Sequence, residues 1–286
     1  MGAFVIDTQT LVGPVRLTVA DLGRALGFYA GVLGLRGARQ PDGGYTLAAG
    51  DLVLLTLDER PGARAKPPRS TGLYHVAILV PTRADLARVI TRLAETRYPV
   101  SGASDHLVSE ALYLDDPDGN GIEIYVDRPR AAWPTAGREV RMAVDPLDID
   151  GLLGELGGTP GPWAGLPAGT TIGHVHLQVA DLRAAEAFYV GVLGFEVMQR
   201  FANSALFLSA GGYHHHLGLN VWAGVGAPPP PADAVGLRHY AVRLPTRRAL
   251  EAVVGRVRAA GLSVEERPDG VLVRDPAQNG VLLCLE

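Results

Sequence analysis

Residues 15–35 read V-R-L-T-V-A-D-L-G-R-A-L-G-F-Y-A-G-V-L-G-L, and residues 175–195 read V-H-L-Q-V-A-D-L-R-A-A-E-A-F-Y-V-G-V-L-G-F. The two stretches align without a gap, which indicates an internal duplication. The chain is therefore expected to consist of two related halves that share one order of strands and helices.

Each copy predicts the same elements. It begins with apolar residues at alternate positions, which is the pattern of a strand with one buried face. Asp21 and Asp181 then stand where a helix N-cap is expected, and Gly34 and Gly194 end the amphipathic helices that follow. Short strands are expected after each helix, so each copy is a β-α-β-β-β module.

A second module follows in each half. Strand patterns at residues 74–80 and 239–244 precede amphipathic helices at residues 82–96 and 246–260, and further strands follow both helices. We therefore predict an α+β fold made of four β-α-β-β-β modules with mixed sheets.

The modules define a simple division of the chain. Residues 1–127 are expected to form the N-terminal half and residues 172–286 the C-terminal half, with two modules each. Residues 128–171 form a linker that contains a short helix near residues 149–156 and is long enough to cover a sheet edge.

Composition narrows the classes of partner. A chain of 286 residues that is 47% hydrophobic can bury a sizeable core. Its net charge of -4 and the lack of a dense basic run argue against nucleic acid, and no apolar run approaches the roughly 20 residues of a membrane helix. The single cysteine, Cys284, allows no intrachain disulfide, which is typical of a cytoplasmic protein.

Residues 104–125, S-D-H-L-V-S-E-A-L-Y-L-D-D-P-D-G-N-G-I-E-I-Y, indicate a hairpin whose turn lies at residues 116–120. In its second strand Glu123 shares a face with Tyr125. On a solvated face that carboxylate needs no partner. On a buried face it must pair with a base, take up a proton or bind a metal.

The spacing His106, five residues, Leu112-Tyr113, two residues, Asp116-Pro117, Gly119 and Glu123 resembles the signature of the extradiol ring-cleavage dioxygenases. These enzymes belong to the vicinal oxygen chelate superfamily, in which paired modules curl a sheet into a cup around a metal. The resemblance implies that fold, and it implies that Glu123 is an iron ligand. Ser104 departs from the signature, which usually has Gly, Asn, Thr or an aliphatic residue there.

In this superfamily the metal ligands come from three strand positions. Those positions hold Pro14, His75 and Glu123 in the N-terminal half, and His174, His239 and Leu282 in the C-terminal half. Proline and leucine have no donor atom, so each half alone lacks one ligand. We therefore predict a metal site of His75, Glu123 and His174 built across the two halves, although the sequence does not show which modules pair.

The resemblance also implies other site residues. The His-His-Leu-Gly-Leu portion is similar to a stretch in which the second histidine is the acid/base, and this position falls on His216. Tyr113 and His106 would hydrogen-bond the substrate oxygens. Strand alternation places four further residues on the inner faces, where we expect them to contact substrate: His176, His214, Asn220 and Tyr125. Each histidine taken singly also suits a hydrogen-bonded core or surface position.

A two-His-one-carboxylate site typically holds non-haem Fe(II), and Mn(II) can use the same ligands. The resemblance implies extradiol cleavage of a catechol-type small molecule with O2, as in the catabolism of aromatic hydrocarbons. The alternative is a non-redox member of the superfamily, either a glyoxalase-like isomerase or lyase or an antibiotic-binding resistance protein. Both a monomer and a homo-oligomer are compatible with the sequence.

Overall fold

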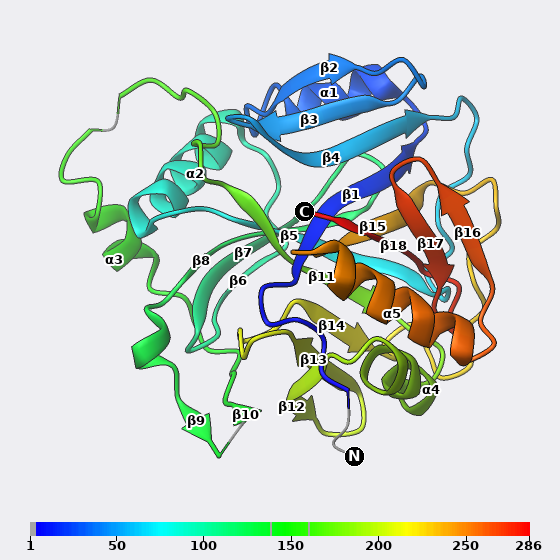
Figure 1. The fold of residues 1–286 in the computed structure, drawn as a ribbon. Coiled ribbons are helices and arrows are strands. Elements are labelled where there is room, and N and C mark those ends of the chain that lie inside the picture. Colours follow the sequence, from blue (N-terminus) through cyan, green and yellow to red (C-terminus); the bar gives the residue numbers. More distant parts are fainter. Residues whose placement is uncertain (1–3, 138, 160) are drawn as a thin grey trace.

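The computed structural model describes residues 4–137, 139–159 and 161–286 (Figure 1). Its strands form two eight-stranded mixed sheets and one two-stranded ribbon. The predicted α+β fold of four β-α-β-β-β modules is confirmed. In each module the first strand runs parallel to the fourth, because a helix returns the chain to the sheet edge and a meander of three strands brings it back.

The first sheet has the strand order β16-β17-β18-β15-β1-β4-β3-β2 and combines the first and fourth modules. Its strands are β1 (Leu11–Val19), β2 (Arg36–Arg39), β3 (Tyr45–Ala49), β4 (Leu52–Glu59), β15 (Gly236–Leu244), β16 (Val264–Arg267), β17 (Gly270–Arg274) and β18 (Gly280–Leu285).

The second sheet has the order β12-β13-β14-β11-β5-β8-β7-β6 and combines the second and third modules. Its strands are β5 (Gly72–Leu79), β6 (Gly102–Asp105), β7 (Ser109–Asp115), β8 (Gly121–Asp127), β11 (Thr171–Gln178), β12 (Glu196–Phe201), β13 (Ala205–Ser209) and β14 (Leu217–Asn220).

Both sheets therefore cross from one half of the chain to the other. The joins are antiparallel pairs of central strands, β1 with β15 and β5 with β11. The second sheet brings the strands of His75 and Glu123 beside the strand of His174, which is the arrangement that the divided ligand set predicts.

The helical elements are α1 (Leu22–Tyr29), α2 (Arg83–Thr96), α3 (Ile149–Gly154), α4 (Leu182–Glu186) with the π-helical turn η2 (Ala187–Val192), α5 (Arg247–Ala259) and the 3-10 turn η1 (Arg130–Ala132). Of these, α1, α2, α4 and α5 contact strands of the sheets, whereas α3 contacts α2. Asp21 and Asp181 accept backbone N–H hydrogen bonds at the helix starts, as predicted. No helix in the described part of the chain is both long enough and apolar enough to cross a membrane.

A buried tyrosine ties each Asp-Pro turn to the helix of another module. The Tyr29 hydroxyl donates to Asp116 (2.9 Å), and the Tyr189 hydroxyl donates to Asp275 (3.0 Å). Asp116 also accepts from the backbone N–H groups of Asp118 and Asn120, each at 2.9 Å. These bonds fix the turn that leads into β8, and hence the strand that carries Glu123.

The linker between the halves lies against the second sheet. It contains α3, as predicted, and the ribbon of β9 (Thr135–Ala136) with β10 (Glu139–Val140). Trp133 and Val140 pack with Met198 of β12 in a small apolar cluster. This contact holds the following residues, 142–144, over the open side of the sheet.

Candidate metal centre

The three predicted ligands come from adjacent strands of the second sheet. His174 on β11 is paired with Ala77 on β5, and Ala77 is paired with Glu123 on β8, so these residues form one row. His75 precedes Ala77 by two residues and points to the same face. Because only a methyl group occupies the middle of the row, the side chains on either side can meet above it.

The ligand atoms lie at mutual distances suited to one ion. The Glu123 Oε2 atom is 2.9 Å from His75 Nε2 and 3.1 Å from His174 Nε2, and the two nitrogen atoms are 3.2 Å apart. Neighbouring ligands about 2.1 Å from an ion and at right angles to each other lie about 3 Å apart. The three atoms therefore fit one face of an octahedron and leave the opposite face open.

Burial and neighbouring charges set the protonation states of Glu123 and His174. Burial alone would raise the pKa of the Glu123 carboxyl, but His174 and His75 outweigh it and hold that pKa well below its usual range. Burial lowers the pKa of His174 to about 4, against the opposing effect of Glu123. At neutral pH the set is thus one carboxylate beside an imidazole with a free lone pair, the forms that bind metals.

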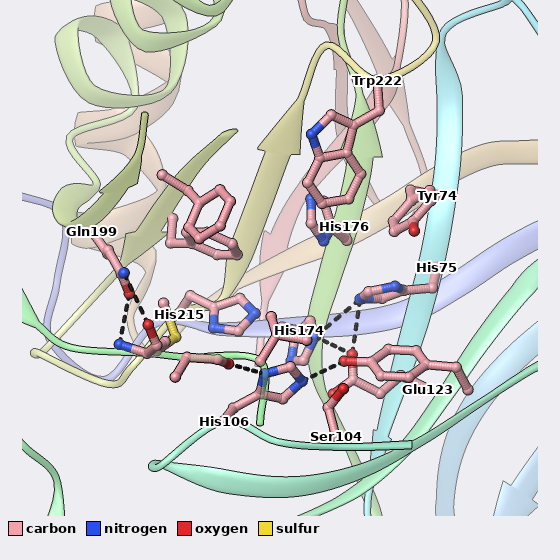
Figure 2. A pocket seen from close by; sticks show the side chains of 16 residues that line it. Tyr74, His75, Ser104, His106, Glu123, His174, His176, Gln199, His215 and Trp222 are labelled. Atoms are coloured by element: carbon pink, nitrogen blue, oxygen red, sulfur yellow. Dashed lines mark hydrogen bonds and ion pairs between the residues drawn. The ribbon is translucent and has the colours of Figure 1, made fainter. Parts of the chain in front are cut away.

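The centre opens into a cavity of about 270 Å³ (Figure 2). Apolar and aromatic side chains make most of its wall, including Phe207, Phe201, Val144, Tyr74 and Trp222. The last two stand at the rim and are each roughly half exposed. None of the described residues that line the cavity is a lysine or an arginine.

His106 and Tyr113 lie together in the cavity wall, as Figure 2 shows for the His106 bonds. His106 Nδ1 is 2.6 Å from the Ala143 carbonyl, and this nitrogen must carry a proton because a carbonyl only accepts. His106 Nε2 lies 2.6 Å from the Tyr113 hydroxyl, so the two side chains share a hydrogen bond. Burial, with Glu123 adding to it, raises the pKa of Tyr113 well above its usual range, so the hydroxyl stays protonated.

The placement predicted for His216 is wrong. His215 lines the cavity, with its ring centroid 4.0 Å from that of His174, whereas His216 lies behind the wall. The Nδ1 atom of His216 accepts from the backbone N–H of Ala210 at 3.2 Å. The strand β14 begins only at Leu217, so strand alternation does not extend back through the three histidines.

One of the four residues expected to contact substrate lines the cavity, namely His176 on β11. The prediction is wrong for Tyr125, His214 and Asn220, which are fully buried and line none of its wall. Asn220 accepts from the backbone N–H of Trp222. Tyr125 does share the face of Glu123, but its hydroxyl fills the space beside Gly173, where a Cβ atom would lie 1.7 Å away.

Sequence reasoning missed the linker's part in the cavity. Met142, Ala143 and Val144 form one wall, and Gln199 on β12 holds Met142 by accepting from its N–H (2.8 Å) and donating to its carbonyl (3.2 Å). This segment has no strand or helix period, so no sequence signal marks it. Trp222 and Tyr74 were missed because an aromatic residue at a strand end more often belongs to the core.

The equivalent positions of the first sheet carry no comparable cluster. Within the described ranges, His75, Glu123 and His174 are the one group of three that could hold a metal. Pro14, His239 and Leu282 occupy the matching places, as expected for a degenerate second set. Burial lowers the pKa of His239 to about 4, so it is neutral at pH 7.

Residues 11–124 and 171–281 match the sequence profile of the Glyoxalase/Bleomycin resistance protein/Dioxygenase superfamily. The chain belongs to this superfamily. Among curated members, it is 48% identical to Catechol-2,3-dioxygenase of Bacillus subtilis (strain 168) over 282 residues, covering 97% of this chain and 98% of that protein.

Two solved structures share the superfamily fold. A candidate dioxygenase from Bacillus subtilis subsp. subtilis str. 168 has a TM-score of 0.66 at 17% identity, covering 98% of this chain and 86% of that one. Glyoxalase I from Zea mays has a TM-score of 0.57 at 16% identity, with 97% and 92% covered. At these identities both comparisons establish the fold alone.

Proposed function

We propose that this superfamily member is an extradiol dioxygenase, which opens the ring of a catechol beside its two hydroxyl groups with O2. The observation that carries the proposal is the facial arrangement of His75, Glu123 and His174 at the floor of an aromatic cavity. Near-full-length similarity to a curated catechol-2,3-dioxygenase supports the same class. A cytoplasmic location is part of the proposal and agrees with the single cysteine, Cys284.

We assign Fe(II) to the three ligands, with Mn(II) as the other metal that suits them. When bound, such an ion supplies the open positions at which the diol and O2 meet and through which electrons pass between them. The chain's own groups do the remaining work. The cavity walls exclude water and orient the ring, which places the reactants together without the entropy cost of a chance encounter.

His215 is the acid/base in this proposal, in place of His216. His215 is not a candidate ligand, but it lines the cavity and its ring contacts that of His174. Burial lowers its pKa well below the usual value, so the ring is neutral and has a lone pair available when a substrate hydroxyl lies beside it. In the proposed role this nitrogen takes up the hydroxyl proton and later returns it. His106 and Tyr113 form a linked pair within reach of the substrate oxygens, and His176 borders the ring.

The cavity wall also selects the substrate. A catechol that carries a carboxylate would bury a negative charge with no lysine or arginine among the lining residues, which is costly. A neutral alkyl or aryl substituent would instead contact Phe201, Trp222 and Val144. We therefore propose a neutral, apolar-substituted catechol as the substrate class.

The test is oxygen uptake after anaerobic loading with Fe(II), using 4-methylcatechol and, separately, 3,4-dihydroxybenzoate. We expect one O2 consumed per yellow ring-opened product from the first substrate and little turnover of the second. Glu123→Gln should abolish turnover, whereas Glu251→Gln, the same change at an exposed site on α5, should not. Tight metal binding without oxygen uptake would contradict the proposal and favour a non-redox member of the superfamily.

A further inference from the structure

A chain of three hydrogen-bonding side chains leads from the end of β8 to the cavity. Asp127 Oδ1 lies 2.9 Å from His214 Nε2, and His214 Nδ1 lies 2.8 Å from His215 Nδ1. His214 is fully buried and does not line the cavity, so it touches no substrate there. His215 ends the chain inside the cavity.

The acceptor at the outer end fixes the direction of these bonds. Asp127 accepts from the Tyr213 hydroxyl as well as facing His214, and an ionised carboxylate can only accept. His214 Nε2 therefore carries a proton. A neutral His214 has no second proton, so its Nδ1 is an acceptor. The bond between the two Nδ1 atoms then requires the proton of His215 to be on Nδ1. The lone pair of His215 Nε2 is left for the cavity.

Packing holds the chain in this geometry. The Trp133 ring lies edge-on to His214 at 5.2 Å between centroids, and the Tyr213 ring lies 4.0 Å from it. Tyr213 is itself bonded to Tyr125 at 2.7 Å. Glu123, Tyr125 and Asp127 alternate along β8 on one face, so one strand carries both the metal ligand and the anchor of His215.

The His214 ring has no exposed surface, and besides Asp127 its neighbours are His215, Trp133 and Tyr213. A ring with a proton on both nitrogens would donate to His215 Nδ1 and leave the proton of His215 on Nε2. The experiment below distinguishes the two arrangements.

We propose that Asp127 and His214 are positioning residues that hold His215 as the Nδ1–H tautomer, with the Nε2 lone pair facing the substrate. The role of His215 rests on the proposed dioxygenase function, but its tautomer does not. The two ideas can therefore fail separately.

The direct test is NMR of the imidazole nitrogens in the full-length, chelator-treated chain labelled with ¹⁵N-histidine. The signals of His215 are assigned by their loss in His215→Gln. We expect His215 to be protonated at Nδ1 and unprotonated at Nε2. Protonation at Nε2 in the unmodified chain would overturn the proposal without recourse to any variant.

Two substitutions at one position provide the matched comparison. In His214→Gln the side-chain carbonyl can accept from His215 and the amide N–H can donate to Asp127, so the tautomer should persist. In His214→Phe it should shift toward Nε2–H. An unchanged His215 spectrum in a folded His214→Phe chain would also refute the proposal.

Kinetics of the Fe(II)-loaded enzyme give a second readout. Loss of a supporting partner of this kind typically costs about 10- to 100-fold in activity. We expect His214→Phe to lower kcat by that factor with KM and iron content nearly unchanged, and His214→Gln to recover most of it. Equal losses in the two variants would argue for a merely structural role. If the unmodified enzyme takes up no oxygen, the proposed dioxygenase function is refuted. The NMR result still decides which tautomer His215 adopts.

Discussion

The histidines of this protein differ in what their second ring nitrogen contacts. His106 lies between the Ala143 carbonyl and the Tyr113 hydroxyl, and His215 Nδ1 lies beside His214 Nδ1. His216 turns its Nδ1 to the backbone N–H of Ala210 and lies outside the cavity. Residue type alone therefore does not distinguish a ligand, an acid/base and a structural imidazole.

Replacing His215 and His216 separately should give opposite results. His215→Gln should lower kcat by about 10²- to 10⁴-fold, the usual loss for an acid/base, and should leave one metal ion bound. His216→Gln should leave kcat within a few-fold and lower the free energy of unfolding by about 1 to 3 kcal/mol, because it disturbs a buried hydrogen bond. Steady-state kinetics and urea unfolding on both variants check this. A larger kcat loss in His216→Gln would restore the assignment made from sequence.

His239 should make the stability of the protein depend on pH. Its pKa is about 4 in the folded chain and near 6.5 when unfolded, so between these values the unfolded state binds more protons. Stability is therefore retained above about pH 6.5 and falls as pH drops toward 4, by about 2 to 3 kcal/mol at pH 4.5.

Urea unfolding of metal-free protein at pH 7.5 and pH 4.5 measures this contribution. The loss on acidification should be smaller in His239→Gln than in the unmodified chain by that amount. An identical loss in both proteins would show that His239 does not couple folding to protonation.

The resemblance to the superfamily gave six possible ligand positions, and the residues at those positions reduced them to the three candidate ligands that the structure brings together. Pro14 and Leu282 cannot bind a metal, so only one combination of His75, Glu123 and His174 was complete. The sequence alone did not show which histidine of the run 214–216 lines the cavity, because this run contains two overlapping His-His pairs. The start of β14 at Leu217 decides between them, and that boundary depends on tertiary packing.

At the scale of elements, the three central strands of the second sheet bring the ligands together. Ala77 lies between His174 and Glu123 in the register of β11, β5 and β8. A larger side chain there would fill the space in which the imidazole and carboxylate meet. The small residue therefore belongs to the candidate metal centre without being one of its three possible ligands.

Ala77→Val should weaken metal binding by at least about 10-fold, as loss of ligand alignment does in other sites. Ala241→Val is the matched control, because Ala241 has the same place in β15 of the first sheet, opposite Leu282. Both variants overpack a buried position and should cost similar stability, about 1 to 3 kcal/mol. Titration with Fe(II) under anaerobic conditions measures the affinity. Equal affinities in the two variants would rule out this role for Ala77.

The strands and helices followed from sequence because their periods are regular. The capping residues Asp21 and Asp181 were placed correctly, but α1 ends at Tyr29 before the predicted Gly34, and α4 continues as the π-helical turn η2 only to Val192. The linker was not predictable in the same way. Residues 142–144 form part of the cavity through contacts of their backbone with His106 and Gln199, and such contacts leave no pattern in the amino-acid sequence.

At the scale of the whole molecule, duplication has produced two sheets of which one keeps the ligand set. Each sheet takes one module from each half, so neither half contains a complete sheet of eight strands. The sequence indicated this crossing only through the divided ligands, because it does not show which modules share a sheet. One candidate centre per chain is the consequence.

The most direct measurement is the number of metal ions bound per chain after anaerobic Fe(II) loading and dialysis. We predict one ion in the unmodified protein, none in His75→Gln or His174→Gln, and one in His239→Gln, which alters the position equivalent to His75 in the first sheet. Two ions per chain, or retention of the ion by His174→Gln, would contradict a single centre built from both halves.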